Sequence, residues 1–266
     1  MSGSLSVVGL GPGSPQQLTP EALDAVASAE DFFGYFPYID RLNLRPDQRR
    51  HASDNREELD RARAALAMAA GGRKVCIVSG GDPGVFAMAA AVCEAIDAGP
   101  VEWREIELSV VPGVTAMLAV AAKAGAPLGH DFCAISLSNN LKPWSIIERR
   151  LIAAAEAGFV MAFYNPISKA RPHQLGEAFD ILRRHLPGSV PVIFGRAAGR
   201  PDEAIRIVNL AEAEGGMADM ATCVIVGTQE TQLIERAGER PLVYSPRSWP
   251  GPKGTAAASA EGKEAK

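Results

Sequence analysis

The chain has 266 residues, of which 47% are hydrophobic, so it is long enough for one large domain or two small ones with a real core. A formal net charge of -4 and a pI near 5.7 argue against a general nucleic-acid binder. No apolar run reaches the length of a membrane span, and no signal peptide is visible, so we expect a cytoplasmic protein that does not bind membranes.

Cysteines and histidines give no sign of a disulfide framework or a metal site. The cysteines, Cys76, Cys93, Cys133 and Cys223, are widely spaced, and none belongs to a Cys-x-x-Cys pair. Three lie in apolar strand-like runs and Cys93 lies in an apolar helical run, so we expect buried free thiols in a reducing compartment. The four histidines show no paired spacing typical of metal ligands, and no metal is expected.

In chain order, short apolar runs alternate with helical patterns. The predicted strands are residues 5–8, 74–78, 107–111, 132–136, 159–164, 191–194 and 222–226. The predicted helices are residues 20–29, 56–70, 84–98, 114–124, 145–157, 174–185 and 202–214. Alternation of this kind predicts an α/β protein with largely parallel sheets.

A domain boundary is expected near residues 112–130, where a small apolar helix is followed by a turn-rich connector. The prediction is an N-terminal α/β domain over residues 1–115 and a C-terminal α/β domain over residues 116–250. The tail at residues 251–266 has almost no bulky apolar residue, and we expect it to be disordered.

Three glycine-rich loops follow predicted strands directly. They are Gly9-Leu-Gly-Pro-Gly13, Ser79-Gly-Gly-Asp-Pro83 and Val111-Pro-Gly-Val-Thr-Ala116. In open α/β sheets, ligands bind beyond the C-terminal ends of the strands. The loops therefore predict a ligand cleft at one edge of the sheet.

The first loop does not fit a dinucleotide. Ser14 stands where the dinucleotide fingerprint has its third glycine, and Pro12 has no N–H to offer a phosphate. The next helix start comes later, at Thr19-Pro20. We therefore interpret the loop as one that allows close backbone approach to a ligand other than a phosphate.

Asp82 and Thr115 each have a simpler interpretation. Asp82 precedes a proline, and its carboxylate projects from the turn or merely caps the helix that follows. Thr115 is equally suited to be a helix-start residue and nothing more. Since three such loops follow three strands, we favour ligand contact for both residues.

Together the loops resemble the signature loops of the tetrapyrrole (corrin/porphyrin) methyltransferases, which use S-adenosylmethionine. The similarity continues through residues 163–166, 194–198 and 223–227 and covers about residues 4–230. It implies two α/β domains with the cofactor in the cleft between them, and commonly a homodimer. By position in the family, the expected cofactor contacts are Pro12, Gly80, Gly81, Asp82, Thr115, Ala116, Asn165, Ala197 and Thr222. Asn165 departs from the uroporphyrinogen members, which have a methionine there.

A narrower similarity, over residues 34–39, 136–144 and 164–172, is to family members that methylate precorrin-3B at C17. It implies ring contraction to precorrin-4 in cobalamin synthesis. Methyl transfer from a sulfonium needs in-line positioning more than a strong nucleophile. For the proton moved during contraction, the candidates are Asp82, Asn139 by orienting a substrate group, and Lys142 if its pKa is lowered.

The substrate of such an enzyme is a ring fringed with carboxylates, which basic and amide side chains would bind. The candidate substrate contacts, Asn140, Lys169, Arg171 and Arg196, lie past strand ends. Solvated surface charge is the simpler interpretation of each basic residue alone, and a structural ion pair competes for Arg196.

Two further hypotheses stay open. Within the family, the substrate could be another precorrin, methylated at C11 or C20, or a cobalt-bearing factor, or the reaction could belong to diphthine synthesis. Outside the family, the first glycine loop would permit an NAD(P)-binding oxidoreductase or a non-catalytic nucleotide-binding module. Ser14 counts against these, and no acidic residue follows a second strand at the ribose-binding distance.

Overall fold

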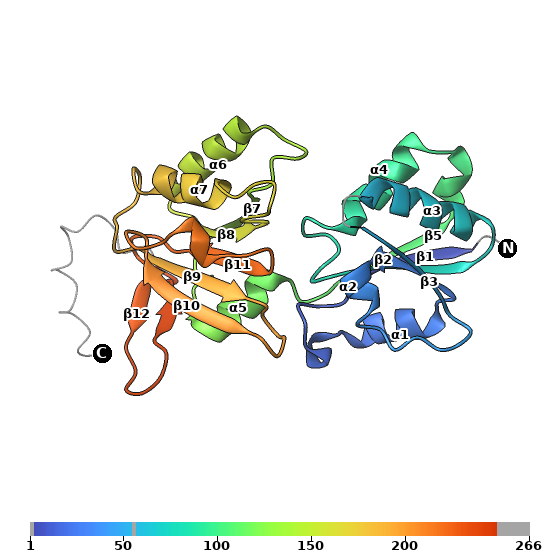
Figure 1. Ribbon diagram of the computed structural model, residues 1–266, viewed down its shortest axis with the longest axis horizontal. Coiled ribbons are helices and arrows are strands. Elements are labelled where there is room, and N and C mark those ends of the chain that lie inside the picture. Colours follow the sequence, from blue (N-terminus) through green and yellow to red (C-terminus); the bar gives the residue numbers. More distant parts are fainter. Residues whose placement is uncertain (1–2, 55–56, 249–266) are drawn as a thin grey trace, which may run out of the picture.

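The computed structural model describes residues 3–54 and 57–248, which form two halves, each built on a five-stranded sheet (Figure 1). The tail predicted at residues 251–266 and the predicted helix start at Arg56 lie outside the described residues. Within the described part of the chain, no helix has the length and apolarity needed to cross a membrane. The α/β fold class is confirmed, and a small three-stranded sheet accompanies the two large sheets.

The N-terminal half is a parallel sheet with strand order β3-β2-β4-β1-β5. Buried side chains on one face pack against α1 and α2, and those on the other face pack against α3 and α4 (Figure 1). The elements are β1 (Ser4–Gly9), α1 (Pro20–Ser28), β2 (Asp31–Tyr35), α2 (Phe36–Ile39), β3 (Arg49–Ser53), α3 (Glu58–Ala70), β4 (Lys74–Ser79), α4 (Met88–Ala98) and β5 (Glu107–Val111).

The register of this sheet brings the three glycine loops to one edge. Gly9, the last residue of β1, pairs with Ser79, the last residue of β4. Val8 pairs with Val111, the last residue of β5. Because the three strands are parallel and end in register, the segments that follow them emerge side by side. After the first loop, Thr19 starts α1 as predicted: its hydroxyl accepts the N–H of Ala22 at 3.1 Å.

The C-terminal half has a mixed sheet with strand order β10-β9-β11-β8-β7. Only β7 and β8 run parallel, so the prediction of largely parallel sheets is wrong for this half. A hairpin-like return from β9 to β10 needs no crossover helix, which allows antiparallel pairing. The elements are α5 (Ala116–Ala124), β6 (Gly125–Ala126), β7 (Phe132–Ser136), α6 (Trp144–Glu156), β8 (Val160–Tyr164), α7 (Gln174–Leu182), β9 (Pro191–Arg196), β10 (Ala204–Asn209), β11 (Thr222–Val226), β12 (Gln232–Ile234) and β13 (Leu242–Tyr244).

The helix predicted over residues 202–214 is wrong, because this segment contains strand β10. Ile205 and Ile207 alternate with Arg206, and both isoleucines pack against the buried cluster that includes α5. Alternation with period two is the strand pattern, and the acidic residues on either side of it imitate helix ends. Strands β2 and β3 also escaped the prediction.

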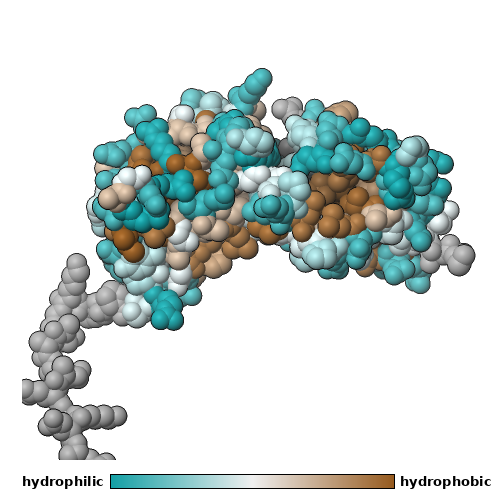
Figure 2. Space-filling model, turned by 90° about the horizontal axis from the view of Figure 1, so that it is seen from below, coloured by the Kyte–Doolittle hydropathy of each residue, from teal (hydrophilic) through white to brown (hydrophobic). Residues whose placement is uncertain are grey.

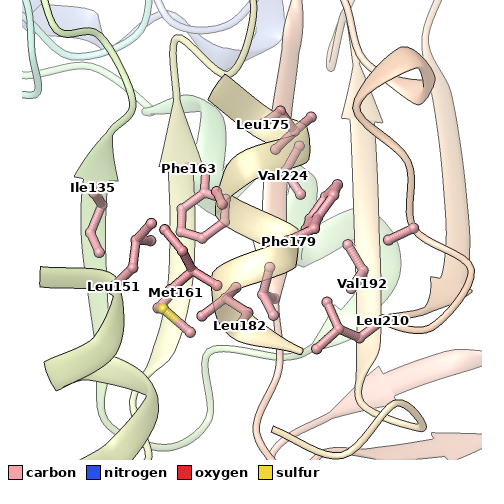
Figure 3. Packing of buried hydrophobic residues seen from close by; sticks show 14 of the residues in the cluster. Ile135, Leu151, Met161, Phe163, Leu175, Phe179, Leu182, Val192, Leu210 and Val224 are labelled. Carbon is pink, nitrogen blue, oxygen red and sulfur yellow. The ribbon is translucent and has the colours of Figure 1, made fainter. Parts of the chain in front are cut away.

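Helices cover both faces of the second sheet and close its core. Figure 3 shows Met161 and Phe163 of β8 packed with Phe179 and Leu182 of α7. The rings of Phe179 and Phe194 meet edge to face at 6.0 Å. On the opposite face, α5 packs against β9, β10 and β11. The sheet ends that carry site residues are therefore fixed by a fully buried core.

The cysteines are free, but they are not all buried. Cys76 and Cys223 are buried, Cys133 is half-buried and Cys93 is exposed, so the prediction of buried thiols is wrong for Cys93. Cys93 lies off the apolar stripe of α4 that faces the sheet. Burial raises the pKa of Cys223 to about 12 and that of Cys133 to about 11, which keeps both thiols protonated and unreactive.

At the edge of the first sheet away from the glycine loops, Asp31 forms a buried charged network. Its carboxylate accepts hydrogen bonds from His51 Nε2 at 2.9 Å and Arg73 Nε at 2.9 Å, and its side chain is fully buried. The His51 ring stacks on Phe33 with centroids 4.5 Å apart. Burial opposes ionisation of Asp31, but the bonds from His51 and Arg73 outweigh it and lower the pKa of the carboxyl group.

We predict that Asp31→Asn lowers the free energy of unfolding by about 2 kcal/mol at neutral pH, since it removes the buried charge that His51 and the partly exposed Arg73 surround. Because the folded pKa lies below the ordinary value of 3.8, the stabilisation is complete above that value and is lost as the pH falls through the folded pKa. Urea unfolding of both proteins at a series of pH values measures the difference.

The exposed pair of Asp60 and Arg63, 3.4 Å apart, gives the control variant, Asp60→Asn, which should change the stability by less than about 0.5 kcal/mol. If the loss of stability caused by Asp31→Asn grows as the pH falls, the lowered pKa of Asp31 in the folded protein is contradicted.

Candidate functional site

The three glycine loops are bonded to one another at the C-terminal edge of the first sheet. Gly11 and Gly81 exchange backbone hydrogen bonds, with N–O distances of 3.1 and 2.9 Å. The Asp82 carboxylate accepts the N–H of Gly113 in the third loop at 3.0 Å. The loops therefore form one rigid wall.

Close packing of the loops explains two of their glycines. A Cβ atom on Gly9 would lie 2.7 Å from the carbonyl oxygen of Gly81, and one on Gly113 would lie 2.3 Å from the same oxygen. Real Cβ atoms do not approach an oxygen that closely. Gly9 and Gly113 let the loops approach each other, which is a different reason from the close ligand approach expected from the sequence.

Asp82 braces the wall and does not cap a helix. One of its carboxylate oxygens accepts the N–H of Gly84 at 2.8 Å, and the other holds Gly113. Helix α4 begins only at Met88, so the interpretation of Asp82 as its cap is wrong. Each carboxylate oxygen keeps a free lone pair after these bonds, so Asp82 retains the capacity to accept a hydrogen bond from a ligand.

Tyr164 joins the third loop to the second half. Its hydroxyl lies 2.5 Å from Thr115 Oγ1 and accepts the backbone N–H of Met117 at 3.0 Å. Thr115 precedes α5 without capping it through its side chain. Burial, opposed in part by the bond to Thr115, raises the pKa of Tyr164 to about 12, so the phenol is neutral. Its ring also contacts that of Phe86, with centroids 5.3 Å apart.

Tyr164 was not among the predicted site residues, although it lies in the segment at residues 163–166 that carries part of the resemblance. A tyrosine at the end of a buried strand has no distinctive spacing. Its partners Thr115 and Met117 lie far away in the sequence, so only the fold reveals the contact.

Three non-glycine residues adopt positive φ in the described part of the chain, and all border this region. They are Phe86 (+53°), Asn165 (+51°) and Ala197 (+49°). Phe86 follows the second loop, and the other two follow strands β8 and β9. Such conformations cost energy and concentrate at binding and catalytic sites. Asn165 and Ala197 were both predicted as cofactor contacts.

The predicted cofactor contacts of the second half lie at one end of its sheet. Asn165 donates from Nδ2 to Ser136 Oγ at 3.0 Å, across the ends of β8 and β7. Ala197 is buried, and the Thr222 hydroxyl donates to an Asp219 oxygen at 2.7 Å. Thr222 pairs with Arg196 in the antiparallel register, which places it beside Ala197.

Contacts between the halves extend to the first loop. The carbonyl of Pro12 accepts a hydrogen bond from Arg200 Nε at 3.3 Å, and a Cβ on Gly13 would lie 2.9 Å from the backbone of Gly199. In Figure 2 the two halves are separate lobes, and hydrophobic residues are exposed on this face of both. The predicted cofactor residues thus come from both halves and meet where the halves join.

Two segments of the second half carry the predicted substrate residues. Lys142 donates to the carbonyl of Ser138 at 3.3 Å, and Arg171 donates to the carbonyl of Asn165 at 3.3 Å. Burial, together with the positive charges of Arg150 and Arg171, lowers the pKa of Lys142, which is the direction that a proton acceptor needs. Asn139, Asn140 and Lys169 are exposed.

Arg196 is held in a structural ion pair. Its guanidinium contacts Asp202 and Asp219, each at 2.7 Å. The competing interpretation from the sequence is therefore the one that the geometry supports. Because both carboxylates already pair with its guanidinium group, Arg196 is poorly placed to bind a substrate carboxylate as well.

The family model of the tetrapyrrole (corrin/porphyrin) methylases matches residues 4–214. The chain belongs to this family. It is 71% identical over 251 residues to a precorrin-3B C(17)-methyltransferase of Sinorhizobium sp., covering 94% of this chain and 99% of the relative.

Two solved structures show the same fold. The methyltransferase CobJ matches with a TM-score of 0.88 and 52% identity, covering 92% of this chain and 100% of the other. A uroporphyrin-III C-methyltransferase of Thermus thermophilus, in complex with S-adenosylhomocysteine, matches with a TM-score of 0.65 and 24% identity, covering 85% and 97%. The Thermus structure supports the fold alone.

We predict that Gly113→Ala destabilises the protein by about 2 kcal/mol, because the added methyl group must push the third loop away from Gly81. The same variant should bind S-adenosylhomocysteine less tightly than the wild type. Thermal unfolding and calorimetry measure the two effects. Gly216→Ala is the matched control, since a Cβ there would meet no atom within 4 Å. Equal behaviour of the two variants would refute the close packing of the loops.

Proposed function

We propose that this protein transfers the methyl group of S-adenosylmethionine to C17 of precorrin-3B in cobalamin synthesis. The observation that carries the proposal is the 71% identity to a precorrin-3B C(17)-methyltransferase, over nearly the whole of both chains. The joined glycine loops support it, since they build a cleft wall at the strand ends where family members are expected to hold the cofactor. Contraction of the ring to precorrin-4 is the finer part of the proposal.

The residues at the wall fit the donors and acceptors of S-adenosylmethionine. The cofactor has an ammonium group and ribose hydroxyls that donate hydrogen bonds, and the Asp82 carboxylate has lone pairs to accept them. The N–H of Ala116, at the start of α5, has no acceptor among the described residues and is available to the cofactor carboxylate. Pro12 contributes no donor, in keeping with a ligand that has no phosphate.

When bound, the cofactor supplies an electrophilic methyl group, and the chain's own task is to position it. The Tyr164 hydroxyl contacts the Thr115 hydroxyl and accepts the N–H of Met117, so the end of β8 is fixed to the third loop and the start of α5. In-line transfer depends on such positioning more than on acid or base strength. For the proton moved during ring contraction, we retain Lys142 as the candidate, since burial favours its neutral form.

The deciding experiment incubates the purified protein with methyl-labelled S-adenosylmethionine and precorrin-3B. We expect label in a product with the mass and absorbance of precorrin-4. Transfer to another precorrin or to a cobalt-bearing factor, with none to precorrin-3B, would reject the proposed substrate. Tight binding of NAD(P) without binding of S-adenosylhomocysteine would reject the whole enzyme class.

Variants of Asp82 and Lys142 should separate cofactor binding from substrate binding. Asp82→Ala should weaken S-adenosylhomocysteine binding at least tenfold and leave the fold intact, because the lost bonds to Gly84 and Gly113 contribute only about 1 kcal/mol each. Lys142→Met should lower kcat for precorrin-3B and raise its KM, with cofactor affinity retained. Calorimetry and steady-state kinetics measure these effects.

Asp82→Asn keeps one carbonyl oxygen as an acceptor and should bind the cofactor better than Asp82→Ala. Lys74→Met, at the opposite end of β4, is the control for Lys142 and should leave KM unchanged. If the Asp82→Ala protein binds the cofactor normally but unfolds easily, then Asp82 has only a structural role.

We further propose a homodimer in the cytoplasm and a domain boundary at residues 115/116. The exposed leucines Leu23 of α1 and Leu118 of α5 support self-association, because both helices lie on the face shown in Figure 2, where both lobes expose hydrophobic residues. Packing of α5 on the second sheet supports the boundary, and the unpaired cysteines suit a reducing compartment. Sedimentation of the purified protein as a monomer at micromolar concentration would exclude the dimer.

A further inference from the structure

Two arginine side chains from opposite halves converge on the first glycine loop. Arg41, just after α2, donates from its terminal nitrogens to the carbonyls of Leu10 at 2.7 Å and Gly11 at 3.2 Å. Arg200, between β9 and β10, donates from Nε to the carbonyl of Pro12 at 3.3 Å. Three consecutive carbonyls of one loop thus hold two guanidinium groups beside each other.

Neither charge has a salt-bridge partner in residues 3–54 and 57–248. The pKa of the Asp202 carboxyl group is nevertheless lowered by its hydrogen bond from Arg196 and also by the charge of Arg200. Arg196, four residues before Arg200, shows the contrast, since two aspartates hold it. Burial lowers the pKa of Arg41, and the nearby charge of Arg200 lowers it further. Two like charges held together cost energy that an anion between them would offset.

Both guanidinium groups keep free donors. Each has five N–H groups, of which the loop carbonyls use two on Arg41 and one on Arg200. Arg200 is exposed and Arg41 is half-buried, so a ligand can reach them. The Tyr38 ring lies beside them and packs on Gly80, where a Cβ would come within 2.6 Å of it. The pair therefore lies next to the second glycine loop as well as the first.

We propose that Arg41 and Arg200 form a carboxylate-binding site, in which one ligand is bound by an arginine from each half of the protein. Planar guanidinium groups bind carboxylates through two parallel hydrogen bonds, which fixes orientation as well as position. The site rests on the proposed function, because both ligands of that reaction carry carboxylates: the tetrapyrrole on its rim and the cofactor at its amino-acid end. Neither arginine is among the site residues predicted from the sequence.

A carboxylate bound here has a consequence for the cleft. Arg41 belongs to the N-terminal half and Arg200 to the C-terminal half, so one ligand group bonded to both links the halves across the first loop. The pair would then position the ligand relative to the wall formed by the glycine loops, and it would be a binding pair with no part in proton transfer.

Single-residue variants test the site with two probes, S-adenosylhomocysteine in calorimetry and uroporphyrin in fluorescence titration. We expect Arg200→Met to weaken the binding of one of the two probes at least tenfold. Because Arg200 makes a single contact with the first loop, the substitution should leave the fold intact. Arg200→Lys, which keeps the charge without the planar fork, should recover only part of the affinity. Loss for S-adenosylhomocysteine alone identifies the cofactor carboxylate as the ligand, and loss for uroporphyrin alone identifies the tetrapyrrole rim.

Arg41→Met provides an independent second variant, with thermal unfolding as a check because its side chain also supports the first loop. Arg63→Met, on the exposed face of α3, is the control and should leave both affinities unchanged. The proposal is overturned if the Arg200→Met and Arg41→Met proteins both bind the two probes as tightly as the wild type does. It is also overturned if the wild type binds neither probe. Failure of the proposed function gives a different result: the wild-type protein transfers no methyl group to precorrin-3B, but its binding of the probes still depends on the two arginines.

Discussion

The backbone pairing of Gly11 with Gly81 is the contact on which the rest of the site depends. It joins the ends of two parallel strands, and the Asp82 carboxylate extends the junction to a third. Backbone groups can come this close only where side chains are absent, so the glycines are required by the wall itself. Internal hydrogen bonds hold the wall in place, while the remaining lone pairs of Asp82 and the N–H of Ala116 stay available to a ligand. The shape of the wall is set before a ligand binds, which lowers the entropic cost of ordering the loops on binding.

The second half completes the site through a few long-range contacts. Tyr164 reaches Thr115 and Met117, and Arg200 reaches Pro12. The bonds of Tyr164 tie the end of β8 to the start of α5, and that of Arg200 ties the loop after β9 to the first loop. The strained conformations of Asn165 and Ala197 lie at the same strand ends. Rigid cores behind both sheets hold these residues, as Figure 3 shows for the second half.

The sequence predicted β1, β4 and β5 of the first half and the glycine loops that meet at their ends, because strand and glycine loop follow one another locally, but it missed β2 and β3. It failed at β10, where acidic residues around the alternating Ile205 and Ile207 imitate a helix, and at β3, a polar edge strand without an apolar run. The roles of Tyr164, Arg41 and Arg200 were also not visible in the sequence, for a different reason. Their roles arise from partners distant in the chain, and nothing in their local spacing distinguishes them from core or surface residues.

The interior position of β1, between β4 and β5 in the first sheet, has a consequence for the growing chain. Leu5 pairs with Val75 on one side and Leu108 on the other, so β1 is made before both of its partner strands and has neither until much later segments follow. Non-local parallel pairing of this kind is slow and leaves apolar strands open to aggregation. The bonds of Tyr164 and Arg200 form later still. The contacts that brace the glycine loops from the second half can therefore be complete only after the chain has been made beyond Arg200.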